Sequence, residues 1–195
     1  MKVVDILIDS AMLLGLTDEA NIMKSATEET EDIVIGEHEN ISSLYNLIKF
    51  SIRELCTNYI PVIREEYVIT QDKKFALNIL ENFIRIRNIE KDGEMIKFKT
   101  INRNVFLEED GKYLVRYESY PYIISMFDEI DFLKNFSPDA IVFGLCAYYS
   151  IAHGMFEDFH EFHERYITKA DSLKSLHNFD LPSRRWEWEQ KKLLK

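Results

Sequence analysis

Residues 137–186 read SPDAIVFGLCAYYSIAHGMFEDFHEFHERYITKADSLKSLHNFDLPSRRW. Ser137 and Pro138 are typical of a helix start, because serine caps free amide groups and proline suits the first helical turn. An apolar helix follows, and Gly154 is expected to break it. A more polar helix then runs over 155–176 and leads into a linker with two arginines and a tryptophan. This order predicts joined helices suited to binding other protein subunits.

The N-terminal part of the chain also favours helices. Apolar residues at helical spacing predict a helix over 2–15 that Gly15 caps, and a short second helix over 17–23. The acidic stretch 25–40 is expected to be a loop or a poorly formed connector. A long helix is predicted over 41–59, because apolar residues recur there at steps of three and four. These residues are Leu44, Leu47, Ile48, Ile52, Leu55 and Cys56.

Strand patterns separate the two helical blocks. The segments are EEYVIT, FIRIRNIE, EMIKFKT and GKYLVRYES, and the second alternates apolar residues with arginines, as a half-buried strand does. Asp92-Gly93 predicts a tight hairpin into residues 95–99. Asp110-Gly111 predicts another that joins 105–107 to 113–117. We therefore expect a small antiparallel sheet of four to six strands.

These patterns predict an α+β fold. It is mainly an α-helical bundle, with an antiparallel β-sheet insertion at about 63–120 between helices and an extended C-terminal tail. Residues 1–180 are expected to form one domain, and 181–195 a docking tail. Each of the last two predicted helices has an apolar stripe that is expected to pack in the core. The stripe of the first of these helices is expected to pack on the 41–59 helix. The stripes are Ile141, Leu145, Tyr148, Tyr149 and Ala152 on the first helix, and Phe156, Phe159, Tyr166, Leu173 and Leu176 on the second.

Composition narrows the classes of function. The 195 residues are 46% hydrophobic, enough for a packed core, and no apolar run approaches the roughly 18 residues that a membrane span needs. We expect no membrane partner and synthesis in the cytosol. The net charge of −10 argues against a general nucleic-acid-binding surface. An acidic wall would still let DNA pass without holding it, although acidity can also serve solubility alone.

Few residues indicate catalytic chemistry. Cys56 and Cys146 each lie in an apolar helical pattern and are expected to be buried free thiols. The sequence has no Gly-x-Ser-x-Gly motif and no glycine-rich phosphate loop. We therefore expect no enzyme activity, no catalytic residue and no cofactor.

A metal site is the one chemical alternative. His160 and His163 lie three apart on a predicted helix and could bind a metal together with Glu157. Zinc helices of the two-histidine type need His-Glu-x-x-His, however, and the second histidine comes one residue early here. A polar helix face is the simpler interpretation, and no metal site is expected.

The C-terminal tail contains residues typical of interface anchors. Arg184, Arg185, Trp186 and Trp188 lie within five positions, and arginine and tryptophan are enriched where protein partners bind. The alternative is a tail that folds back onto its own bundle.

Four segments together resemble the head-to-tail connector (adaptor) proteins of tailed bacteriophages and their prophage relatives. The first two are IRELCTNYIPVIREEYVI at 52–69 and DGKYLVRYESYP at 110–121. The others are AYYSIAHGMFEDFHEFHERY at 147–166 and LPSRRW at 181–186. The resemblance covers residues 50–186.

The resemblance implies a ring, commonly of twelve copies, between the portal and the tail of the virion, with DNA passing through its channel without sequence-specific binding. The bundle would build the ring, and Arg184, Arg185, Trp186 and Trp188 would dock on the portal. The β insertion would face a neighbouring subunit or a downstream neck or tail protein. Acidic residues could line or rim the channel. They are Glu28, Glu29, Glu31 and Asp32.

Three other functions stay open. The chain could be another phage neck or tail component, which its position in the virion would reveal. It could be a cellular α+β interaction module, whose gene would not neighbour portal, capsid and terminase genes. A metal-dependent enzyme that uses His160, His163 and Glu157 is the third.

Overall fold

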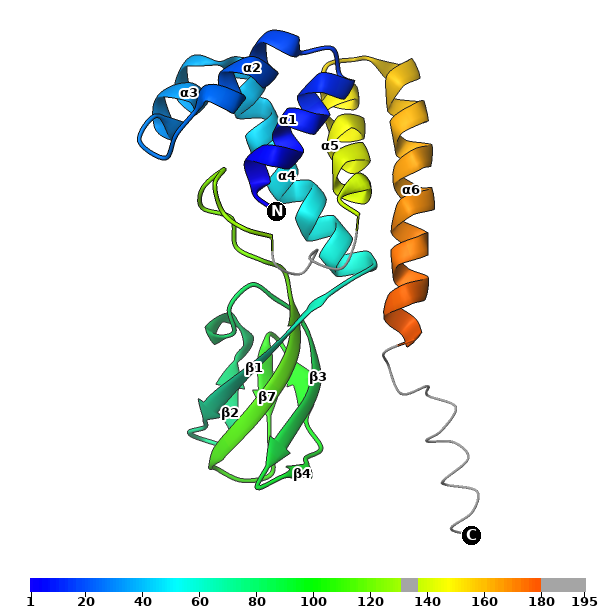
Figure 1. The fold of residues 1–195 in the computed structure, drawn as a ribbon. Coiled ribbons are helices and arrows are strands. Elements are labelled where there is room, and N and C mark those ends of the chain that lie inside the picture. The colour runs from blue at the N-terminus through cyan, green and yellow to red at the C-terminus, as the bar shows by residue number, and fades with distance from the viewer. Residues whose placement is uncertain (131–136, 180–195) are drawn as a thin grey trace. The chain divides into compact units, whose positions relative to one another are not determined.

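The computed structural model describes residues 1–130 and 137–179. The chain forms two compact units, a helical unit of Met1–Leu55 with the residues from Ile123 onward, and a β unit of Cys56–Tyr122 (Figure 1). Helices and antiparallel sheets confirm the predicted α+β fold with a sheet inserted between helices. The predicted C-terminal tail lies outside the described residues.

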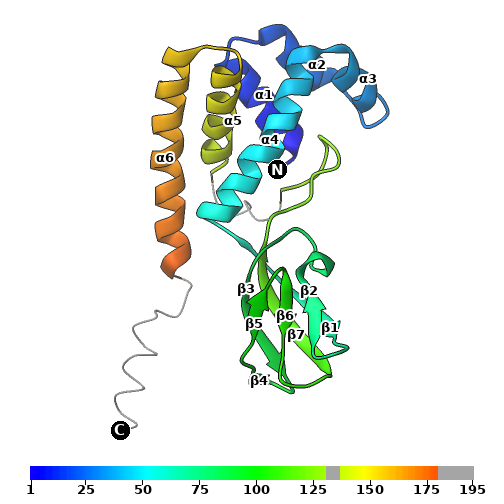
Figure 2. The same cartoon turned by 180° about the vertical axis from the view of Figure 1, so that it is seen from behind.

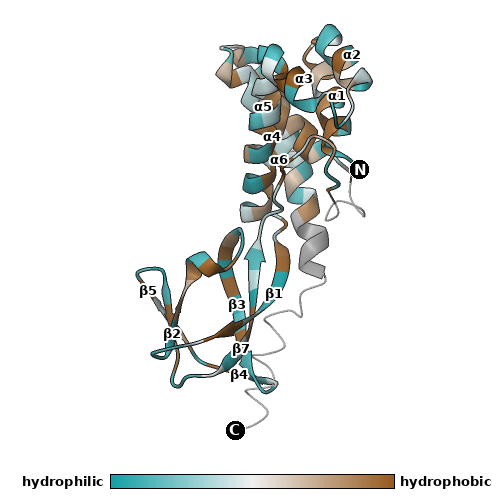
Figure 3. Cartoon of the chain, turned by 90° about the vertical axis from the view of Figure 1, so that its left-hand side faces the viewer, coloured by the Kyte–Doolittle hydropathy of each residue, from teal (hydrophilic) through white to brown (hydrophobic). Residues whose placement is uncertain are grey.

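Six helices account for most of the described helical unit. They are α1 (Val3–Leu13), α2 (Thr17–Ser25), α3 (Glu31–Glu37), α4 (Glu39–Asn58), α5 (Asp139–Ala152) and α6 (Phe156–Phe179). All the predicted helices are confirmed, and these helices carry both hydrophobic and hydrophilic residues (Figure 3). The predicted loop over 25–40 is wrong in part, because α3 lies within it.

Tertiary hydrogen bonds explain why α3 forms in so acidic a stretch. The Glu31 carboxylate is buried and accepts hydrogen bonds from the backbone amide of Met126 at 2.7 Å and the Ser125 hydroxyl at 2.5 Å. The Tyr45 hydroxyl donates to the Ile124 carbonyl in the same segment. Partners nearly a hundred residues away therefore hold the first turn of α3, and no local pattern could predict them.

Glycine ends α5 as predicted. Gly154 has φ +74°, a left-handed conformation that glycine adopts without strain. Its amide donates to the Ile151 carbonyl at 3.3 Å and the Met155 amide donates to the Ser150 carbonyl at 2.8 Å, which together form a Schellman cap. Gly15 ends α1 in the same way, also with φ +74°.

Close backbone approach joins α4, α5 and α6. A side-chain carbon at Gly144 would lie 2.7 Å from the Ser51 hydroxyl oxygen and 3.1 Å from the Tyr166 ring. The Tyr148 hydroxyl donates to the Glu54 carboxylate, and the Tyr166 hydroxyl donates to the same carboxylate at 3.1 Å. The three helices lie side by side in Figures 1 and 2, and these contacts confirm that α5 packs on α4.

The predicted stripes are only partly right. Ile141, Leu145 and Tyr149 are buried, but Ala152 is exposed at the end of α5. Phe156, predicted to be buried on α6, is 64% exposed because it lies in the first turn after the break. Among the side chains of α6 that the structure describes, which do not include Leu176, the buried ones are Tyr166, Ala170 and Leu173.

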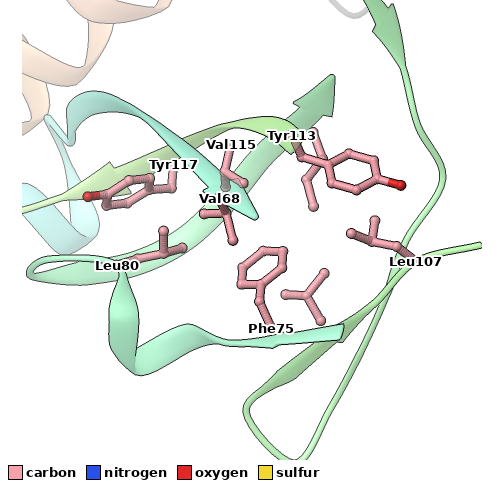
Figure 4. Packing of buried hydrophobic residues seen from close by; sticks show 9 residues of the cluster. Val68, Phe75, Leu80, Leu107, Tyr113, Val115 and Tyr117 are labelled. Atoms are coloured by element: carbon pink, nitrogen blue, oxygen red, sulfur yellow. The ribbon is translucent and has the colours of Figure 1, made fainter. Parts of the chain in front are cut away.

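Two antiparallel sheets build the β unit. One has the strand order β1-β7-β3-β4 and the other β2-β6-β5. The strands are β1 (Val62–Ile69), β2 (Lys74–Ala76), β3 (Phe83–Lys91), β4 (Glu94–Met95), β5 (Lys99–Ile101), β6 (Asn104–Phe106) and β7 (Lys112–Ser119), with a short 3-10 helix, η1 (Leu77–Ile79). Residues from both sheets form one hydrophobic core, shown in Figure 4. Its buried members are Val68, Phe75, Leu80, Ile89, Val105, Leu107, Tyr113, Val115 and Tyr117.

One predicted hairpin is confirmed and the other is wrong. Asp92-Gly93 joins β3 to β4 with φ of 53° and 86°, as a two-residue turn between antiparallel strands requires. Asp110-Gly111 does not join β6 to β7, which belong to different sheets. The Gly111 carbonyl instead accepts the amide of Thr70 at 2.9 Å, which directs β7 onto β1. The hairpin that sequence analysis missed turns at Asn102-Arg103, with φ of 49° and 61°, and joins β5 to β6.

Candidate interaction surfaces

The edge strand β1 has an apolar outward face. Its burial alternates along the strand, so that Val68 enters the core while Ile63, Tyr67 and Ile69 face outward, 46%, 67% and 75% exposed. Among the described strands, β1 pairs with β7 alone, which leaves its other edge free to bind a partner strand. Exposed apolar side chains beside a free strand edge are typical of protein–protein contacts.

The neighbouring strand extends this outward face. Leu114 of β7 lies opposite Tyr67 and is half-buried. The Lys112 amine lies 4.2 Å from the centre of the Tyr67 ring, a cation–π contact that holds the ring in place. The outward face of β1 is therefore mainly apolar, with the ion-paired Glu65 in its middle and the Lys112 cation at one end.

Ion pairs neutralise the arginines of the four-stranded sheet. Arg116 pairs with Glu65 at 2.6 Å and with Glu90 at 2.7 Å. Arg85 pairs at 2.5 Å with Glu118, whose side chain is fully buried, and Arg87 pairs with the same carboxylate. A partly exposed pair such as Arg116–Glu65 contributes only about 0–1 kcal/mol. Together the ion pairs leave this sheet with little net charge.

Charge is divided unevenly between the two units. The β unit contains 11 lysines and arginines and 11 aspartates and glutamates, and has no net charge. The whole net charge of −10 therefore belongs to the rest of the chain. Such separation favours contacts between unlike surfaces of different molecules.

The acidic residues expected to line a channel differ in their exposure. Glu28, Glu29 and Asp32 are exposed, and a neighbouring molecule could meet them. Glu31 is buried against the segment that follows the β unit and holds α3 in place. Its expected channel role is therefore wrong.

The histidines of α6 lie on an exposed helix face. His160 and His163 are exposed, as is Glu157. The His163 ring stacks on Phe159, with 5.2 Å between ring centres, and His153 stacks on Tyr149 at 4.1 Å. Among the side chains that the structure describes, no three from His, Cys, Asp or Glu come together as metal ligands would.

Both cysteines are buried free thiols, as predicted. Loss of hydration raises the pKa of Cys56 from the ordinary value of 9.0 to about 12. Burial likewise raises the pKa of Cys146 to about 12, against a smaller opposing effect of the Ser10 side chain. Neither side chain supplies a thiolate nucleophile near neutral pH.

The predicted docking residues Arg184, Arg185, Trp186 and Trp188 lie outside the described residues. The outward face of β1 is the surface that sequence analysis missed. The signal was present in VIREEYVI, where apolar residues occupy both alternating sets of positions. A strand with one solvent-exposed face needs apolar residues at only one alternating set of positions. The second apolar set therefore marks a face that a partner can cover.

In the part of the chain that the structure describes, no helix has the length and apolar character needed to cross a bilayer. No protein-family model matches the chain, and no curated protein matches it.

Proposed function

We propose that the chain is a virion structural protein, a head-to-tail connector of a tailed bacteriophage or prophage. Copies of it form a ring between the portal and the tail, and DNA passes through the ring. The proposal begins from the four sequence segments that resemble this class. The structural observation that carries it is the apolar outward face of β1, with Ile63, Tyr67 and Ile69 beside a free strand edge.

A ring needs two different surfaces on every subunit, because each copy contacts one neighbour on each side. The β1 face provides one surface. The helical unit provides further exposed apolar side chains, with Phe50 54% and Phe156 64% exposed. These exposed aromatic side chains are candidates for the second surface.

The charge distribution suits a channel for DNA. The net negative charge of the chain lies in the helical unit, because the β unit has no net charge. Acidic residues at a channel wall repel phosphate, so DNA passes without being held. In this proposal Arg184, Arg185, Trp186 and Trp188 dock on the portal.

Imaging tests the proposal directly. The purified full chain is viewed by negative-stain electron microscopy, alone and with the portal protein of the same phage or prophage. We expect rings alone, and ring density on one face of the portal in the mixture. Monomers at every concentration and bare portals in the mixture would refute the proposal.

A surface variant then tests the β1 face. Tyr67→Ser combined with Ile69→Ser should abolish rings while the circular dichroism spectrum is unchanged. Ile79→Ser, which removes a residue 54% exposed on η1, is the matched control and should leave rings intact. Rings that persist in the β1 variant would show that another surface holds the subunits together.

The same apolar face also supports a second candidate, an α+β interaction module with no virion role. Gene neighbourhood separates the two, because a connector gene lies beside portal, capsid and terminase genes. Position in the virion separates a connector from other neck and tail components.

A further inference from the structure

Two segments of the β unit are basic and contain no acidic residue. KKFALNIL at 73–80 and IKFKTINRNVFL at 96–107 carry five cations, in a chain that has 34 acidic and 24 basic residues. Together they supply β2, β5 and β6, the whole of the three-stranded sheet (Figure 2). The cations therefore belong to one structural element.

The strand register places two of these cations beside an exposed phenylalanine. Lys74 of β2 and Lys99 of β5 both lie opposite Phe106 of β6, and residues opposite one another share a face of a sheet. Val105, the preceding residue, enters the core, so Phe106 faces outward and is 40% exposed. Ile101 shares this face and is 53% exposed.

The cations of this face are exposed and unneutralised. None of them forms an ion pair with any described residue, whereas every arginine of the four-stranded sheet does. Lys74 and Lys99 lie on the face by register, Lys97 lines the adjoining groove, and Lys73 and Arg103 lie in the turns next to the strands. We call these five residues with Ile101 and Phe106 the basic face.

A groove beside the basic face adds apolar surface. Its volume is about 650 Å³, and it is lined by Ile96, Lys97, Phe98, Lys99, Phe106, Leu107 and Glu108. Among the described strands β5 pairs with β6 alone, so this edge of the sheet is free as well. Nucleic acid would use the lysines but leave the apolar side chains without a partner. An acidic protein segment with an exposed apolar residue fits both.

The chain itself presents such a segment around α3. Ile33 is 57% exposed at its centre. Glu28, Glu29, Asp32 and Glu37 are exposed around it in sequence. The α3 segment, residues 28–37, therefore has an apolar side chain surrounded by acidic ones. It complements the basic face, where apolar side chains are surrounded by basic ones.

We infer that the basic face of one copy binds the α3 segment of a second copy. Because the two surfaces differ, the contact is head to tail. A dimer therefore still has one unoccupied basic face and one unoccupied α3 segment. Repetition then closes a ring where the rotation allows it. The inference rests on the proposed ring, for which it names a subunit contact.

Charge reversal tests the contact. Lys97→Glu with Lys99→Glu makes the basic face acidic, and Glu29→Lys with Asp32→Lys makes the α3 segment basic. Each variant alone should weaken self-association at least about tenfold in sedimentation velocity, because like charges then meet. Equal mixing of the two variants should restore it, since each unlike pair of surfaces attracts again. Lys97→Arg with Lys99→Arg keeps the charge and is the matched control.

The outcomes separate this inference from the proposed ring. Assembly of the wild type that neither reversal affects would overturn the contact and leave the ring in place. A wild type that never assembles would refute the ring itself. A reversal that instead abolishes binding of short fluorescent duplex DNA, with assembly unchanged, would assign the basic face to nucleic acid and overturn the contact. Failure of mixing to restore assembly would also count against it.

Discussion

The helical unit and the β unit are specified in different ways. In the helical unit, small residues allow close helix packing, as where Gly144 of α5 meets Ser51 of α4. In the β unit, tight turns at Asp92-Gly93 and Asn102-Arg103 set the pairing of strands around a single core. The surfaces differ too, since one unit carries the net charge of −10 and the other separates paired arginines from an unpaired basic face. The residues that pack each unit are therefore different from the exposed residues that a partner could contact.

The largest expected effect is in the core of the β unit. Ile89→Ala removes a fully buried side chain of β3 and should lower the free energy of unfolding by about 2–5 kcal/mol. Hydrogen exchange should show lost protection across residues 62–119 while α5 keeps its protection. Met95→Ala, at a position 76% exposed, is the control and should change stability by less than about 0.5 kcal/mol. Equal loss of protection in α5 would mean that the two units unfold as one.

The second effect concerns helix packing. Gly144→Ala places a carbon 2.7 Å from the Ser51 hydroxyl oxygen, and overpacking of this kind costs about 1–3 kcal/mol in chemical denaturation. Gly36→Ala is the matched control, because nothing lies within 4 Å of the added carbon. There the better helix propensity of alanine should stabilise the chain by up to about 1 kcal/mol. A neutral Gly144→Ala would show that the contact is looser than described.

Alkaline pH should weaken the fold through the buried thiols. In the unfolded chain each thiol loses its proton above its ordinary pKa of 9.0, whereas burial raises the pKa of Cys56 and Cys146 to about 12 in the folded chain. Deprotonation thus favours unfolding between pH 9 and 12. The expected loss is on the order of 1 kcal/mol per thiol by pH 10, measured by urea denaturation. A Cys146→Ala variant should lose less over the same range, and an equal loss would contradict the assignment.

The smallest expected effect on stability is that of the C-terminal tail. Deletion of 182–195 should leave the melting transition almost unchanged and abolish portal binding. An unfolded truncated chain would instead show that the tail belongs to its own bundle. The double variant Arg184→Ala, Trp186→Ala in the full chain removes side-chain contacts but keeps the chain length. Its portal binding shows which of the two losses matters.

Local patterns were enough for most elements but not for how distant ones meet. Gly154 predicted a helix end because only a left-handed cap fits there, and the structure confirms it. Asp110-Gly111 predicted a hairpin that does not form, because a hydrogen bond between Thr70 and Gly111 assigns β7 to β1. Long-range pairing of this kind leaves no signal within a short window of sequence.

The candidate surfaces follow the same rule. The basic composition of 96–107 is visible in the sequence, but its meaning depends on the register that places Lys74 and Lys99 beside Phe106. In the sequence Glu31 resembles the exposed acidic residues around it. In the structure it is buried and accepts a hydrogen bond from the Met126 amide. Sequence therefore predicts which residues are unusual, and the fold decides which of them a partner can reach.

The most direct test of the central claim is the mass of the full chain in solution. Sedimentation velocity over a range of concentrations should show one closed oligomer in equilibrium with monomer, and negative-stain images of the larger species should show a ring with an open centre. A chain that stays monomeric at every concentration, or that forms an unlimited ladder of sizes, would contradict the account.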